Sequence, residues 1–201
     1  MIMTENVEQH ELRDRLDLIE TMIAEGRRKC ESWGWTFVLW GVAYYVAFFW
    51  ADWTHFTYAW PVTVITAGLI TMAGFWRRVD NAPNTTMGRA IAAVWIATGI
   101  SMFVLFDALG FSGRLTDAQI FFAVAGAMLG TANAACSIML KWKAEFGCSL
   151  VWWAAAVVAS FGTANQATGA FLAAIFLCQI VFGTYMMILE SRQRRQVASH
   201  A

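Results

Sequence analysis

The chain has 201 residues, of which 59% are hydrophobic and only 14% are charged, whereas an ordinary soluble domain has about 25% charged residues. Basic and acidic residues each number 14, so the formal net charge is zero. Because basic residues are not in excess over acidic ones, no nucleic-acid partner is expected. The composition excludes an ordinary soluble domain and indicates burial in a lipid bilayer.

The first segment, residues 1–30, is predicted to be an amphipathic helix at the cytoplasmic face of the membrane. Four of its apolar residues have the spacing of a coiled-coil seam, which two further apolar residues widen: Leu12, Leu16, Ile19 and Ile23, with Leu18 and Met22 beside them. The surrounding residues are mainly acidic, whereas a helix that binds anionic lipid is expected to be basic. Three interpretations stay open: packing on the chain's own loops, self-association into a homo-oligomer, and binding of a separate protein partner.

Residues 31–191 contain six apolar stretches that are read as helices crossing about 30 Å of hydrocarbon, and the fifth of them is the shortest. We expect them at residues 34–53, 57–76, 88–109, 117–140, 148–162 and 169–189. Each is expected to be helical because lipid offers no hydrogen-bond partner to the backbone. The predicted fold is an all-α integral membrane protein with six transmembrane helices, and residues 192–201 form a short tail.

The basic residues predict the orientation of the spans. Thirteen of the 14 lysines and arginines fall before the first span, between the second and third or at the very start of the third, between the fourth and fifth, or after the sixth. Only Arg114 falls on the other side. Because basic residues in short loops stay in the cytoplasm, both termini are predicted to be cytoplasmic. Short loops with this bias favour a bacterial inner membrane.

A spacing of aromatic and polar residues recurs in the three odd-numbered spans. Trp40, Phe48 and Asp52 are matched by Trp95, Phe103 and Asp107, and then by Trp153, Phe161 and Asn165. The recurrence predicts three tandem hairpins in one orientation. It also places Asp52, Asp107 and Asn165 at the outer ends of these spans as a candidate polar site. Hydration of the three side chains, or capping of the following helix, is the alternative.

Two strongly polar residues are predicted to lie deep in the bundle, Asn133 in the fourth span and Gln179 in the sixth. Asn133 continues a stripe of small residues that includes Gly126 and Gly130, and such stripes favour close helix packing in membranes. A polar cavity wall is the alternative. No charged residue is expected at mid-membrane, which argues against ion-coupled transport.

The chain shows no pattern of catalytic, metal-binding or cofactor-binding residues. Its three histidines are widely separated in the predicted topology, and its four cysteines have no CxxC spacing and are expected to be reduced. The sequence therefore favours a non-enzymatic membrane protein that acts in assembly or partner interaction through its N-terminal helix. The alternative is a transporter, channel or binding protein for a neutral or lipophilic small molecule.

Overall fold

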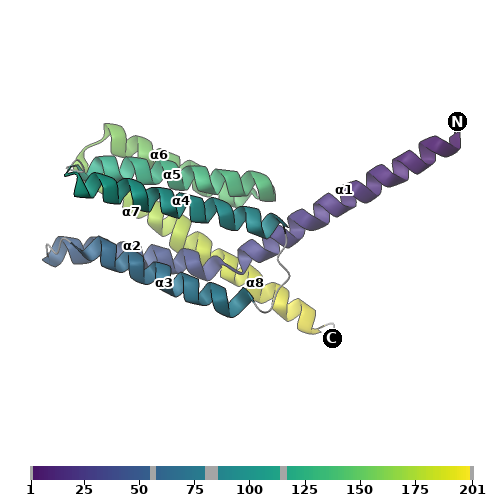
Figure 1. Ribbon diagram of the computed structural model, residues 1–201, viewed down its shortest axis with the longest axis horizontal. Helices are drawn as coiled ribbons and strands as arrows, with labels where there is room; N and C mark the ends of the chain where they lie inside the picture. The colour runs from purple at the N-terminus through teal and green to yellow at the C-terminus, as the bar shows by residue number, and fades with distance from the viewer. Residues whose placement is uncertain (1, 55–57, 80–85, 114–116, 200–201) are drawn as a thin grey trace.

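The computed structural model describes residues 2–54, 58–79, 86–113 and 117–199, and in these ranges the chain is helical without a strand. Figure 1 shows the arrangement of the helices. They are α1 (Ile2–Glu31), α2 (Gly34–Thr54), α3 (Ala59–Val79), α4 (Thr86–Phe111), α5 (Ala118–Leu140), α6 (Lys143–Phe161), α7 (Ala164–Ile175) and α8 (Phe182–Ser199), with a π-helical segment η1 (Phe176–Val181) between the last two.

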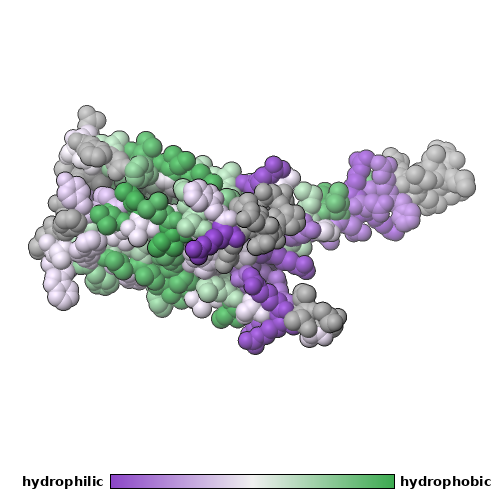
Figure 2. Space-filling model, turned by 60° about the horizontal axis from the view of Figure 1, so that its bottom comes forward, coloured by the Kyte–Doolittle hydropathy of each residue, from purple (hydrophilic) through white to green (hydrophobic). Residues whose placement is uncertain are grey.

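Six helical segments of the described chain are long and apolar enough to cross a membrane, which is the number that the sequence predicts. They are α2, α3, α4, α5, α6 and the unbroken rod formed by α7, η1 and α8. In Figure 2, hydrophobic residues cover the bundle, whereas hydrophilic residues gather at the end from which α1 projects. This distribution suits a bundle surrounded by hydrocarbon, because lipid offers no partner to polar groups.

Small residues let α5 and α6 approach closely at the centre of the bundle. A Cβ atom added to Gly126 of α5 would lie 3.1 Å from the carbonyl oxygen of Trp152 of α6. A larger residue at this position would therefore push the two helices apart. Among the spans, α5 has the largest share of buried residues and α4 the smallest. The small-residue stripe of α5 thus serves helix packing, which is the main way in which helices associate in lipid.

The first and last spans also lie side by side, at the crossing of α2 with α8. A Cβ atom added to Gly34 would lie 2.7 Å from the carbonyl oxygen of Gly183, and one added to Gly183 would lie 2.9 Å from that of Gly34. The reciprocal contact fixes the start of α2, and with it the end of α1, against the middle of the last rod.

The connection between the fourth and fifth spans is shorter than predicted. α5 ends at Leu140 because Lys141 has a left-handed φ of 50°. The N–H group of Lys141 donates to the carbonyl oxygen of Ile138 at 3.3 Å, which satisfies one free carbonyl at the helix end. α6 then begins at Lys143, whereas the sequence prediction placed the start of this span at Cys148. Residues 143–147, which the sequence prediction assigned to the loop, therefore belong to α6.

The sixth span is likewise longer than predicted at its start. Thr163 and Gln166 form a capping box, in which the Thr163 N–H donates to Gln166 Oε1 at 2.9 Å. This pairing satisfies donors that the first helical turn leaves free. α7 therefore begins at Ala164, not at Gly169 as predicted.

Helix connectivity brings one set of helix ends together. α1, α3, α5 and α8 end, and α2, α4 and α6 begin, on the side of the bundle from which α1 projects (Figure 1). We call it the basic end, because its helix ends include Arg27, Arg28, Lys29, Arg77, Arg89, Lys141, Lys143, Arg192, Arg194 and Arg195. Arg114, which was predicted on the opposite side, lies outside the described residues.

Candidate functional site

The free part of α1 carries the predicted seam. Residues 10–22 are all solvent-exposed, and α1 extends away from the bundle (Figure 1). Leu12, Leu16 and Ile19 are 57%, 55% and 50% exposed, while Ile23 is half-buried. The first three seam residues are therefore not covered by the chain's own loops in the described structure. Within the described ranges these three residues are exposed, and the three interpretations of the seam stay predictions.

The base of α1 is packed into the basic end of the bundle. A Cβ atom added to Gly26 would lie 2.5 Å from Met87 Cγ of α4 and 3.2 Å from Leu140 Cδ2 of α5, so α1 packs closely on both helices there. The Arg27 guanidinium carbon lies 4.8 Å from the centre of the Trp142 ring, within the range of a cation–π contact. Cys30 is buried, and burial raises the pKa of its thiol well above the ordinary value, with Glu145 and then Cys136 adding to the shift.

Glu31, the last residue of α1, joins this helix to α8. Its carboxyl accepts a hydrogen bond from Gln193 Nε2 at 2.6 Å and lies 3.6 Å from Arg27 Nε. Burial raises the pKa of Glu31 above its ordinary value, while Arg27 and the hydrogen bond from Gln193 oppose the shift. Only 3% of the residue is exposed. The three side chains form what we call the base latch, defined by Glu31, Arg27 and Gln193.

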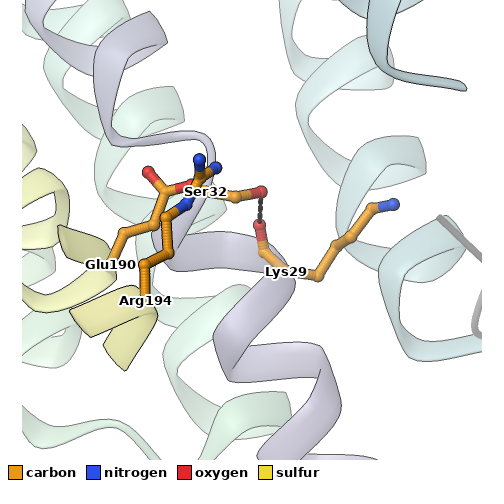
Figure 3. Close-up of polar contacts among 4 residues, drawn as sticks. All are labelled: Lys29, Ser32, Glu190 and Arg194. Carbon is orange, nitrogen blue, oxygen red and sulfur yellow. Dashed lines mark hydrogen bonds and ion pairs between the residues drawn. The ribbon is translucent and has the colours of Figure 1, made fainter. Parts of the chain in front are cut away.

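The turn that follows α1 is ordered by local hydrogen bonds. Ser32 Oγ donates to the carbonyl oxygen of Lys29 at 2.7 Å, and Arg194 pairs with Glu190 at 2.6 Å on the neighbouring face of α8 (Figure 3). The Arg194 side chain is 75% exposed, so its ion pair adds little stability. The main contacts at the base of α1 are therefore those of the base latch and of close packing.

A groove of about 510 Å³ opens where the seam meets the bundle. Its walls come from α1, the end of α5 and α8, and include Glu20, Ile23, Arg27, Leu140, Tyr185 and Leu189. A second groove, of about 470 Å³, is apolar and runs along α2. Neither groove is lined by Asn133 or Gln179.

The two polar residues predicted in the bundle interior are indeed buried. Asn133 is 1% exposed, and its Nδ2 donates to Leu129 O of its own helix at 2.8 Å, not to a neighbouring helix. Its Oδ1 atom has no partner among the described residues. Gln179 is 4% exposed and lies in η1, and its Cβ atom would be 2.8 Å from a Cβ atom added to Gly41 of α2. Both residues therefore lie at helix contacts and away from the two grooves.

Glu145 is a buried acidic residue that the sequence interpretation missed. It lies in the first turn of α6, is 0% exposed, and has both carboxyl oxygens without a hydrogen-bond partner in the described structure. Glu145 lies near the start of this span and not at mid-membrane, and it falls inside the span because α6 starts earlier than predicted. A carboxyl in the first turn of a helix gains from the helix dipole, but that gain is smaller than the cost of burying an unpaired acid.

The three residues of the outer polar site lie on different kinds of helix end. Asp52 is exposed in the last turn of α2, whereas Asn165 is exposed in the first turn of α7. Asp107 lies in α4, and its side chain is outside the described part of the structure. No hydrogen bond joins the described side chains of Asp52 and Asn165. The shared site and the three-hairpin repeat both stay predictions.

The chemistry available in the described bundle is limited. No three His, Cys, Asp or Glu side chains of the described residues are placed to hold a metal ion. Cys30, Cys136, Cys148 and Cys178 are free and buried. No family model, curated protein or solved structure matches this chain.

Proposed function

We propose that this chain is a non-enzymatic integral membrane protein that assembles into homo-oligomers through α1. The six-helix bundle is the membrane anchor, and the basic end faces the cytoplasm, in keeping with the preference of basic loops for that side. A bacterial inner membrane suits the short connections. The observation that carries the proposal is the exposed seam of Leu12, Leu16 and Ile19 on a helix that projects from the bundle.

The seam supplies a driving force for association. Full burial of a Leu or Ile side chain contributes about 1.5–3 kcal/mol, and each copy offers Leu12, Leu16 and Ile19 at half exposure or more. Association of two free proteins costs at least about 4 kcal/mol in lost translational and rotational freedom. Copies confined to one bilayer have already lost part of that freedom, so a short seam is sufficient.

The base of α1 supports the same proposal, because a binding surface gains affinity when it is held in place before binding. The base latch and the close contact of Gly26 with α5 fix the direction in which the seam leaves the bundle. By contrast, nothing comparable supports transport of a small molecule. Asn133 and Gln179 are buried, and neither lines either of the two grooves described above.

The test replaces Leu16 and Ile19 together with Asp and measures the mass of the protein in lipid nanodiscs. We expect at least two copies per particle for the unmodified protein and one for the variant. The matched control replaces His10 and Thr21 with Asp, which adds the same two charges on the opposite face of α1. A single copy before the change, or an unchanged oligomer after it, would refute assembly through the seam.

A further inference from the structure

The bundle constrains how two α1 helices can meet. Copies inserted in one bilayer with the same orientation carry their basic ends on the same side, and α1 projects from that end (Figure 1). Two neighbouring α1 helices therefore run away from the membrane together. The antiparallel pairing would require both helices to turn and lie along the membrane surface, whereas the packed base of α1 holds it in its outward direction.

The seam spacing sets the register of a parallel pair. With Leu16 and Ile23 at heptad position a, and Leu12 and Ile19 at position d, the flanking position g is Arg15 and the next position e is Glu20. In a parallel pair of helices, a residue at position g of one helix faces the residue at the next position e of the other. Arg15 of each copy would then meet Glu20 of the other, so one register gives two opposite-charge pairs.

Both side chains are exposed, so they can reach a second copy. Glu20 is exposed at the rim of the groove. Arg15 pairs within its own helix with Glu11 at 2.5 Å, but these side chains are 73% and 61% exposed. An ion pair so open to water is weak, and Arg15 has several donors that can contact a second carboxylate.

We infer that the partner of α1 is the α1 of a second copy, bound parallel and in register, with Arg15 of each copy paired with Glu20 of the other. The pairing rests on the proposed function, because it needs the seam. It adds the identity, direction and register of the partner, and these can fail while assembly through the seam stands.

Disulfide trapping in membranes tests the direction. The four native cysteines are buried, so a cysteine placed at Leu12 is the accessible thiol of each chain. In the parallel register the two Leu12 positions are opposite each other. In an antiparallel pair centred between Leu16 and Ile19 they would be about 16 Å apart along the axis, too far for a disulfide. We expect Leu12→Cys to cross-link at least ten times faster than Thr21→Cys, which lies on the opposite face.

Charge exchange tests the register. Glu20→Arg should weaken association about ten-fold, and adding Arg15→Glu to the same chain should restore it to within about two-fold. In an antiparallel pair Glu20 would face Arg13, so Arg13→Glu would be the restoring change. Equal trapping at positions 12 and 21, or rescue by Arg13→Glu and not by Arg15→Glu, would overturn the parallel register. If the Leu16→Asp, Ile19→Asp variant forms no oligomer but cross-linking at position 12 is still slow, the parallel register is wrong and assembly through the seam stands. If that variant forms the same oligomer as the unmodified protein, the proposed function is wrong as well.

Discussion

Replacement of Glu31 by Ala should loosen the base of α1 while leaving the six spans folded. The change removes the acceptor of the 2.6 Å hydrogen bond from Gln193 and the partner of Arg27 at 3.6 Å. A buried donor left without a partner costs about 1–3 kcal/mol. The Arg27 side chain is 41% exposed, so water reaches part of its guanidinium, although its Nε atom is buried. The variant no longer buries a carboxyl group, which offsets part of the cost of the lost contacts. The net loss of stability at the base of α1 should be about 1–2 kcal/mol.

Hydrogen exchange of residues 24–31 in nanodiscs measures this cost locally. A loss of about 1–2 kcal/mol should speed exchange about 5–30-fold, because the base of α1 opens more often. Glu190→Ala, which removes the exposed ion pair with Arg194, is the control and should change exchange little. Equal exchange in the two variants would refute the assignment of the base latch.

The pH dependence of the same exchange gives the sign of the electrostatic contribution. Burial raises the pKa of Glu31 in the folded protein above its unfolded value, so the folded state binds the proton more tightly. The stabilisation from Glu31 should therefore be complete below the unfolded pKa and be lost as pH rises through the folded pKa. Glu31→Gln should remove this dependence. Protection that increases with pH in the unmodified protein, after correction for intrinsic exchange, would contradict the sign.

Three further changes test other parts of the structure. Glu145→Gln should leave the thermal stability unchanged or raise it by about 1 kcal/mol, because an unpaired buried acid becomes neutral; a clear loss would mean that Glu145 has a stabilising partner. Asp52→Asn should change the free energy of unfolding by less than about 0.5 kcal/mol, since the side chain is exposed, and a larger effect in thermal unfolding would revive the outer polar site. A membrane-impermeant thiol reagent added outside intact cells should label Ser112→Cys and spare Arg195→Cys, and the reverse pattern would invert the proposed orientation.

The number of spans could be predicted from the sequence because hydrocarbon sets both a minimum length and a nearly apolar composition. The spacing of Leu12, Leu16, Ile19 and Ile23 predicts a seam on α1, and this stays a prediction. The sequence could not predict whether the seam is exposed or covered, because this depends on the tertiary contacts of Gly26 and Glu31 at the other end of α1.

Glu145 was missed for a related reason. Charged residues around Lys143 suggested a loop, yet a left-handed residue at Lys141 ends one helix and lets the next begin two residues later. A signal was present in the sequence, since Glu145, Ser149 and Trp152 share one helix face and all three are 0% exposed. The partner of Asn133 was also beyond the sequence, because a side chain in lipid can bond its own helix as readily as a neighbour.

Energy transfer between donor-labelled and acceptor-labelled copies in liposomes measures whether copies associate in the bilayer through the seam of α1. As lipid is added at constant protein, transfer in the unmodified protein should persist to dilutions at which random proximity gives none. The Leu16→Asp, Ile19→Asp variant should lose transfer at those dilutions, while the His10→Asp, Thr21→Asp control keeps it. Identical dilution curves for all three proteins would contradict the account.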